Sequence, residues 1–389
     1  LVSSSAASDV YKRQSENGPS TICEGINNPM PSIALEHSDV IVGVDTHKDE
    51  HVAVAIDGLG GIIGEPLFVP ANNDGYRQLL DWAVGLGDVH AFGVEGCGSY
   101  GSGLAKFLRR HDQLVREVAR PPRRGERRAS GKSDTIDAEH AARVVLSGDG
   151  TATPKLADGQ VEAIRVIKIA RNTAVKAHTT AMITLKAVLV TAPADLREQL
   201  EPLTDHQLIL ACADLDLCGD IADPAVAIRH SLASLARRYL DLHEEIRVHS
   251  NHLKQLVAAA APQMLERFGV GFDTAAEMLI TAGDNTDRVR SEAAFAKLCG
   301  ACPIPAGSGK TSGRHRLNRG GNRQANAALY RVVIVRMRWH PPTIDYVERR
   351  TGEGLSKKDI IRCLKRFVAR ELYQLLPEPS NPAKAQITT

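Results

Sequence analysis

The chain has 389 residues, 43% of them hydrophobic, so it can bury the cores of two or three domains. No apolar run approaches the roughly 18 residues that cross a membrane, and the seven cysteines are scattered, as in a reduced cytosolic protein. We therefore expect neither a membrane partner nor a disulfide-stabilised secreted fold. The formal net charge of +2 conceals a strong asymmetry between segments.

Residues 1–38 are predicted to be a disordered or non-native leader. The first 28 residues are polar, rich in serine and without periodicity, and the opening L-V-S-S-S-A-A-S-D-V-Y-K-R-Q resembles translated sequencing-adapter read-through. We expect Met30 to be the biological start, and residues 378–389 to form a loose tail.

Residues 39–155 have the pattern of an α/β domain. Apolar or alternating runs predict strands over residues 41–46, 51–57, 62–69, 89–95 and 114–119. Amphipathic runs predict helices over residues 73–84 and 101–110, and a third helix from Asp134. This order, strand-strand-strand-helix-strand-helix-strand-helix, is that of the ribonuclease H fold.

Four carboxylates of this domain are expected to converge. Asp45 and Glu95 each end an apolar strand, and sheets with parallel strands present ligands at strand ends. Asp134 and Asp137 lie three residues apart at the start of an alanine-rich helix, which puts them on one face. Taken alone, this helical pair is better explained as first-turn acids behind an N-cap at Ser133.

A cluster of four carboxylates repels itself unless it binds a cation. Oxygen ligands select Mg²⁺ or Mn²⁺ over zinc, and a two-ion site about 4 Å across suits phosphoryl transfer. We predict that two such ions are held by Asp45, Glu95, Asp134 and Asp137. The neighbouring His47 and Lys48 are expected to support the site or lie at the surface rather than catalyse.

Two basic segments flank the acidic residues. One runs from Arg109 to Lys132, and the other, from Ala293 to Ile344, contains no Asp or Glu. Basic segments are often only solvated surfaces, but two of them beside a cation site indicate a polyanionic partner. The residues expected to contact nucleic acid are Arg123, Arg124, Arg127, Arg128, Lys132, Lys310, Arg314, Arg316, Arg319 and Arg323.

The remainder of the chain is predicted to be helical. Residues 156–264 show long helical periodicity over 164–189 and 225–258, with an irregular break between them and an apolar stripe suited to a core or a coiled coil. Residues 265–377 begin with a turn at 269–275 that resembles a helix-hairpin-helix. Further helices are expected over residues 291–298, 326–338 and 356–376. Basic residues of the first long helix could contact RNA or simply face solvent: Arg165, Lys168, Arg171, Lys176 and Lys186.

Asp45, Glu95 and the Asp134-x-x-Asp137 pair within G-K-S-D-T-I-D-A resemble the DEDD signature of the insertion sequence 110 family of transposases. The resemblance extends from about Val40 to Arg338. It implies an α/β plus α chain: a ribonuclease H-like (RuvC-like) N-terminal domain, a helical coiled-coil insert and a mainly helical C-terminal transposase domain. It also implies a prokaryotic, cytoplasmic protein associated with the nucleoid.

The same resemblance implies a chemistry and a set of partners. In this family a serine nucleophile acts with the metal site, and a bridge RNA encoded by the element guides recombination. Ser308 matches the position of that serine, and Ser312 is the alternative because Ser312-Gly313 repeats the Ser-Gly pair. The implied partners are element ends and target DNA, a structured guide RNA, and further copies of the chain in a dimer and a synaptic tetramer.

Other functions stay open on the sequence alone. A metal-dependent nuclease or junction resolvase would hydrolyse DNA with water, but it would have no use for the serine-bearing basic region. An inactive nucleic-acid-binding relic would not need an intact set of four carboxylates. A sugar-kinase-like ATPase also begins with a strand that ends in Asp. It would have a Gly-rich phosphate turn where this chain has Thr46-His47-Lys48.

Overall fold

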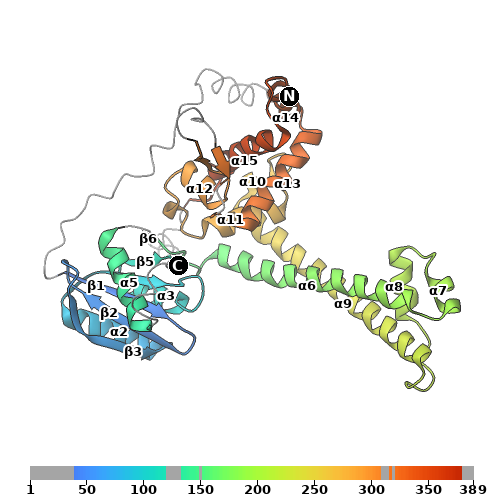
Figure 1. Ribbon diagram of the computed structural model, residues 1–389, viewed down its shortest axis with the longest axis horizontal. Helices are drawn as coiled ribbons and strands as arrows, with labels where there is room; N and C mark the ends of the chain where they lie inside the picture. The colour runs from blue at the N-terminus through green and yellow to red at the C-terminus, as the bar shows by residue number, and fades with distance from the viewer. Residues whose placement is uncertain (1–38, 120–132, 149–150, 308–314, 318–319, 379–389) are drawn as a thin grey trace, which may run out of the picture. The chain divides into compact units, whose positions relative to one another are not determined.

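The computed structural model describes residues 39–119, 133–148, 151–307, 315–317 and 320–378 (Figure 1). These residues fold into two compact units. The first unit contains the described residues up to Ala157 together with residues 285–294, and the second contains residues 158–284 and 295–377. No helix in the described ranges is both long and apolar enough to cross a membrane.

A mixed six-stranded sheet forms the centre of the first unit. Its strands are β1 (Asp39–Thr46), β2 (Glu50–Ile56), β3 (Ile62–Pro70), β4 (Asp88–Glu95), β5 (Val115–Val118) and β6 (Thr151–Ala152). They are hydrogen-bonded in the order β3-β2-β1-β4-β5-β6. β1, β4 and β5 run parallel, whereas β2, β3 and β6 run antiparallel to their neighbours.

Helices cover both faces of this sheet. They are α2 (Asn73–Leu86), α3 (Ser102–Arg110) and α5 (Asp134–Ser147). Successive residues of a strand point to opposite faces. In β1, Val42 accordingly packs in one cluster with Leu79 of α2 and Leu104 of α3, whereas Ile41 packs with Ala142 of α5. α2 and α3 therefore lie on one face of the sheet and α5 lies on the other.

Two glycines allow α5 to lie close against the sheet. A Cβ atom on Gly43 would be 2.0 Å from the carbonyl oxygen of Ala138, and one on Gly93 would be 2.7 Å from that of Ala141. These distances are far below a normal contact, so a larger residue fits only if the helix moves. The helix itself presents the buried alanines Ala138, Ala141 and Ala142 to the strands. The start of α5 is thereby fixed beside the ends of β1 and β4.

The predicted strands and helices of this unit are confirmed to within two residues at each end. β6 was not predicted, because two residues are too few to show a periodic pattern. Ser133 occupies the N-cap of α5 as predicted, but its hydroxyl makes no capping bond and lies 2.6 Å from the Thr135 hydroxyl. The predicted α/β plus α class is confirmed, since a helical second unit accompanies this mixed sheet.

Residues 285–294 belong to the first unit although they follow the arm in the sequence. They hydrogen-bond to residues 153–156, which connect β6 to the second unit. The Asn285 side chain donates to the carbonyl oxygen of Pro154 at 3.0 Å and accepts from the amide of Leu156 at 3.1 Å. Arg288 Nε donates to the carbonyl oxygen of Thr153 at 2.9 Å. The first unit is therefore built from two separate stretches of chain.

A long helical arm extends through the first half of the second unit. It consists of α6 (Gln160–Val190), α7 (Ala194–Leu200), α8 (Asp205–Ala213) and α9 (Pro224–Ala260). α6 and α9 lie side by side and run antiparallel (Figure 1), with Leu185 packed near Leu232 and Arg171 bonded to Ser250. The predicted long helices are confirmed. The break expected between them is also confirmed, and it contains α7 and α8, which were not predicted.

The rest of the second unit packs short and medium helices with a small hairpin. These elements are α10 (Pro262–Leu265), α11 (Phe272–Ala282), β7 (Pro303–Pro305), β8 (His315–Leu317), α13 (Arg323–Trp339), α14 (Pro341–Gly352) and α15 (Lys357–Tyr373). A 3₁₀ turn at Thr286–Arg288 belongs to the first unit, and α12 (Glu292–Leu298) begins there and ends in the second. The β7–β8 pair and α14 were not predicted. The division into domains at residues 155 and 264 stays a prediction.

Buried ion pairs fix the base of the arm. Lys168 of α6 is 5% exposed, and its Nζ lies 2.5 Å from a carboxylate oxygen of Asp273 in α11. Arg171 of α6 and Arg331 of α13 approach the same carboxylate at 3.4 and 2.9 Å. Lys168 is therefore a structural residue, and its expected availability for RNA contact is wrong.

Gly43→Ala should destabilise the protein, because the added methyl group meets the backbone of α5 rather than a movable side chain. We expect a loss of about 1–3 kcal/mol or more in the free energy of unfolding, measured by urea denaturation. Gly85→Ala in α2 is the matched control, since nothing lies within 4 Å of its Cβ position. That control should gain about 0.5–1 kcal/mol from helix propensity. Equal effects of the two changes would contradict the close packing of α5.

Candidate metal centre

Asp45 and Glu95 lie side by side at the ends of two parallel strands. The register of β1 and β4 pairs Val44 with Val94, so the two acids follow at the same level. The Thr46 hydroxyl donates to the carbonyl oxygen of Glu95 at 2.9 Å and ties the two strand ends together. Asp45 is 8% exposed and Glu95 is 6% exposed.

Both acids are on the face of the sheet that α5 covers. Gly43 and Gly93 meet α5, and residues two positions further along a strand point to the same face. Asp45 and Glu95 are those residues. The first turn of α5 contributes Asp134 and Asp137 at the same edge. The fold thus brings the four predicted carboxylates to one face and one edge of the sheet.

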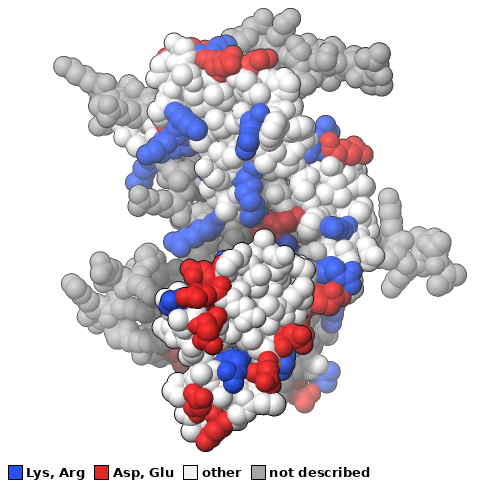
Figure 2. Space-filling model, turned by 90° about the vertical axis from the view of Figure 1, so that its right-hand side faces the viewer, with Lys and Arg blue, Asp and Glu red and all other residues white. Residues whose placement is uncertain are grey.

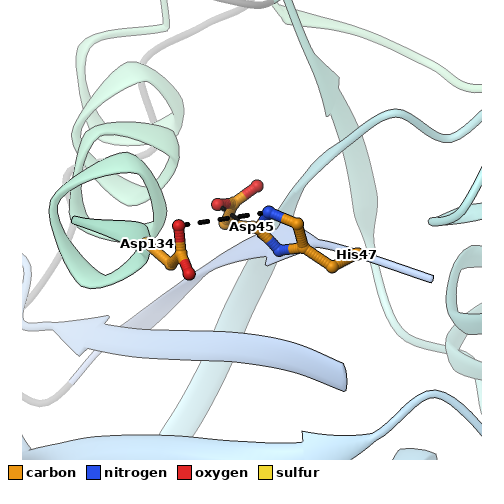
Figure 3. A group of neighbouring side chains, drawn as sticks. All are labelled: Asp45, His47 and Asp134. Carbon is orange, nitrogen blue, oxygen red and sulfur yellow. Dashed lines mark ion pairs between the residues drawn. The ribbon is translucent and has the colours of Figure 1, made fainter. Parts of the chain in front are cut away.

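Among the described residues, Asp45, His47 and Asp134 form a group compact enough to hold one metal ion. The His47 Nδ1 lies 3.8 Å from a carboxylate oxygen of Asp45, and its Nε2 lies 4.0 Å from one of Asp134. One ligand atom from each of these three residues lies within 4.8 Å of the others. Figure 3 shows the three side chains pointing toward one another from the end of β1, the residues that follow it and the start of α5.

The electrostatics of Asp45 reflect this crowding. Burial raises the pKa of Asp45, and the charges of Asp137 and Asp134 raise it further, while His47 lowers it. A buried carboxylate among other carboxylates is stabilised by a cation. Oxygen donors with one imidazole nitrogen fit a divalent ion such as Mg²⁺ or Mn²⁺, with the nitrogen better suited to Mn²⁺. The residues present therefore fit a divalent metal.

The structure separates the remaining predicted site residues into two groups. Arg316 lies in β8 and Arg323 is the first residue of α13, and both are exposed. The others lie outside the described residues: Ser308, Arg123, Arg124, Arg127, Arg128, Lys132, Lys310, Arg314 and Arg319. Metal binding by Asp45, Glu95, Asp134 and Asp137 also stays a prediction, although the strands and α5 place these acids at one end of the sheet.

His47 was expected to support the site or lie at the surface, and the structure places it beside Asp45. The signal was its position two residues after Asp45, just beyond the strand end. A turn closes there, with the His47 amide donating to the carbonyl oxygen of Glu50 at 3.1 Å. The turn holds the imidazole beside the acids, where its side chain is 48% exposed.

This fold and this cluster define an α/β protein with a carboxylate-rich site for a divalent cation at the edge of its sheet. Residues 42–192 match a family model described as a transposase of the DEDD type of IS110, and residues 262–348 match one described as Transposase IS116/IS110/IS902 family. The chain belongs to the IS110 family of DEDD transposases. The family predicted from the sequence is confirmed.

One curated relative supports the same assignment. Over 145 residues the chain is 29% identical to the 43.6 kDa protein of insertion element IS110 from Streptomyces coelicolor. The aligned stretch covers 37% of this chain and 36% of that protein, about a third of its length.

Asp45→Asn should stabilise the metal-free protein at neutral pH. A raised pKa means that the folded state binds this proton more tightly, so the charged side chain lowers stability as the pH rises above its ordinary value of 3.8. Asparagine removes that charge. We expect a melting temperature about 1–4 °C higher by calorimetry, with the difference shrinking as the pH falls toward 3.8.

The same experiment tests the metal. Saturating Mn²⁺ should raise the melting temperature of the unsubstituted protein and leave Asp45→Asn unchanged. Asp57→Asn is the matched control, because Asp57 is equally buried but accepts hydrogen bonds from the amides of Leu59 and Gly61. That variant should lose stability and keep the metal response. An unchanged metal response in Asp45→Asn would place the ion elsewhere.

Proposed function

We propose that this protein is a DNA transposase that cuts and rejoins strands by metal-dependent phosphoryl transfer with a serine nucleophile. The observation that carries the proposal is the convergence of Asp45, His47 and Asp134 at the edge where β1 and β4 end, in a chain of the IS110 family. Family membership implies DNA as a partner. The acid-free basic stretch from Ala293 to Ile344 supports that partner independently.

We assign the first unit to the ribonuclease H-like (RuvC-like) fold. The support is the strand order β3-β2-β1-β4-β5, in which β1, β4 and β5 are parallel and β2 and β3 are antiparallel. In such a sheet the open edge at the ends of the parallel strands receives the ligand. An open pocket lined by Gly96, Ser99 and Val118 lies at this edge.

In this proposal Asp45, Glu95, Asp134 and Asp137 hold two Mg²⁺ or Mn²⁺ ions, with His47 as a nitrogen donor. Such ions supply charge stabilisation for the attacking and leaving oxygens of an in-line phosphoryl transfer. The chain's own part is to hold the ligands rigidly. Asp45 and Glu95 lie on paired strands, and α5 packs directly against Gly43 and Gly93, which keeps its first turn close to the strand ends.

Ser308 is the proposed nucleophile. Its hydroxyl oxygen would form a bond to the scissile phosphorus as the bond from phosphorus to the leaving strand breaks, and the proton lost by the hydroxyl would be balanced by one gained by the leaving oxygen. Lys310 and Arg316 follow it in the sequence and could neutralise charge on the phosphate. The segment that contains Ser308 joins β7 to β8, which pair antiparallel.

The proposal extends to partners that family membership alone does not establish. They are a structured guide RNA encoded by the element, which would select the target by base pairing, and further copies of the chain in a dimer and a tetramer. We place the protein in the prokaryotic cytoplasm, associated with the nucleoid.

A metal-dependent nuclease or junction resolvase is the second candidate. It is favoured by one observation, namely that the carboxylate cluster lies entirely within the first unit and could act on DNA without the serine. An inactive relic is a weaker candidate, because all four carboxylates are retained.

Asp134→Asn should abolish recombination between element ends and target while leaving the fold intact. The expected loss exceeds about 100-fold, the upper range for residues that only support a metal ligand. Asp74→Asn is the matched control, since Asp74 is likewise an acid in the first turn of a helix. Product formation would be followed by sequencing of the new junctions. Full activity of Asp134→Asn would remove this residue from the site.

Ser308→Ala should eliminate a covalent protein–DNA adduct, and Ser312→Ala should retain it. Mapping of the phosphoserine by mass spectrometry after denaturation identifies the residue directly. An adduct on Ser312 would move the assignment there. Strand cleavage that depends on Asp134 without any adduct would favour the hydrolytic nuclease.

A further inference from the structure

We propose that Asn326 and Lys365 are positioning residues for the serine chemistry, because they fix the turn from which the β7–β8 hairpin projects. The inference rests on the proposed function, since the segment that joins β7 to β8 contains Ser308. It goes further by assigning a role to two side chains of the second unit that the proposed chemistry does not otherwise use.

The β7–β8 hairpin has little to hold it in place by itself. β7 reads Pro303-Ile304-Pro305 and pairs antiparallel with β8. Proline has no amide hydrogen, so Ile304 is the one residue of β7 that can donate a backbone hydrogen bond to β8. A two-stranded hairpin is only marginally stable even with a full set of such bonds. The direction in which this hairpin projects must therefore be set by contacts at its base.

The base is a buried turn, residues 299–302, which links α12 to β7. Gly300 has a φ of +63°, in the left-handed region that favours glycine. The turn is bonded back to α12, because the Gly300 amide donates to the carbonyl oxygen of Lys297 at 3.0 Å and the Ala301 amide donates to that of Ala296 at 2.8 Å. These bonds use the amides of the turn, and its carbonyl oxygens accept from α13.

Asn326 of α13 binds two of these carbonyl oxygens at once. Its Nδ2 donates to the carbonyl oxygen of Cys299 at 3.0 Å and to that of Gly300 at 2.9 Å. One turn earlier, the backbone amide of Asn322 donates to the carbonyl oxygen of Leu298 at 2.6 Å. Three successive carbonyl groups at the end of α12 are thus held by the first part of α13.

Both ends of the hairpin lead to this same place. β7 follows the turn directly, and β8 is followed by Gly321 at the start of α13. Gly321 packs so closely on the turn that a Cβ atom on it would lie 2.2 Å from the amide nitrogen of Gly300. The contact between the turn and α13 therefore determines where both strands of the hairpin begin to project, and Asn326 makes the side-chain hydrogen bonds of that contact.

Lys365 of α15 sets the orientation of the Asn326 amide. Its Nζ donates to the Asn326 Oδ1 at 2.9 Å. An ammonium group can donate but not accept, so Oδ1 must face Lys365 and Nδ2 must face the two carbonyl oxygens. If the amide turned over, Oδ1 would meet those carbonyl oxygens and both hydrogen bonds would be lost.

The burial of Lys365 shows that it serves more than packing. Lysine and arginine ordinarily lie at the surface, as those coloured in Figure 2 do, whereas Lys365 is only 7% exposed. Burial and the nearby charge of Arg362 lower the pKa of Lys365, so its charged form is disfavoured there. An apolar side chain would fill the same space without that cost. What the lysine adds is a single orientation of the amide that holds the turn.

A double variant separates positioning from stability. Asn326→Leu alone leaves the Lys365 ammonium buried without a partner, so the melting temperature should fall. Adding Lys365→Met replaces the pair by two apolar side chains of similar size, and the melting temperature should recover much of that loss. If the pair only stabilised the fold, activity would recover with it.

We expect the double variant to stay defective in the full-length chain, well below its melting temperature. Hydrogen exchange of the amides in residues 298–305 should be about 10- to 30-fold faster, as for the loss of two hydrogen bonds. The covalent adduct should form about 10- to 100-fold more slowly at saturating element-end DNA, with the guide RNA supplied, because a nucleophile displaced by about 1 Å reacts poorly. The affinity for that DNA should be unchanged.

Asn322→Asp is the matched control. It changes an amide to a carboxylate on the same helix and keeps an oxygen that accepts from the amides of Gln324 and Ala325, and the backbone bond to Leu298 is unaffected. Exchange in residues 298–305 and the rate of adduct formation should match those of the unsubstituted protein.

Two results would overturn the inference alone. A double variant that forms the adduct at the unsubstituted rate would show that the pair only packs the interior, whether or not exchange becomes faster. A loss that disappears at saturating DNA would make the pair part of DNA binding instead. Failure of the proposed function looks different, because the unsubstituted protein would then form no serine adduct at all. That result would remove the positioning role together with the nucleophile.

Discussion

The close approach of α5 to the sheet is the contact on which the site depends. Glycine at positions 43 and 93 and alanine at 138, 141 and 142 remove the side-chain layer that normally separates a helix from a sheet. Two acids fixed on strands and two on a helix can converge only when that layer is absent. The carboxylates are therefore positioned by residues that carry no chemistry themselves.

That arrangement places an unfavourable charge in the protein. Asp45 is buried beside other acids, and its raised pKa shows that the folded metal-free chain holds the carboxylate against its electrostatic preference. Active sites commonly retain such groups at a cost in stability. Here the hydrogen bond from Thr46 and the packing of α5 keep the site assembled. A cation bound beside Asp45 would relieve this unfavourable charge.

Much of this arrangement was predictable because it is local. Each signal lies within a few residues of the sequence. Apolar runs predict strands that end in Asp45 and Glu95, and the three-residue spacing predicts that Asp134 and Asp137 share one face of a helix. α8 also had a readable signal, since Thr204 and Gln207 form a capping box. The Pro and Asp residues around it predict a break between helices, so α8 was not predicted.

Features that depend on distant partners were not predictable. Lys168 looks like any helical surface lysine until α11 brings Asp273 to it from 105 positions away. The contribution of His47 depends on the turn after β1, and the three-residue strands β7 and β8 are too short to show a period. These interactions arise from the tertiary structure.

The two-part construction of the first unit has a consequence for how the chain is made. Residues 285–294 supply the hydrogen bonds that Asn285 and Arg288 make to Pro154 and Thr153, yet the whole stretch 158–284 is synthesised in between. On the ribosome, these hydrogen bonds can therefore form only after residues 158–284 have been synthesised. These contacts join residues about 130 positions apart, so they raise the contact order of the first unit. A chain truncated after Ala157 would lack that closing segment for good.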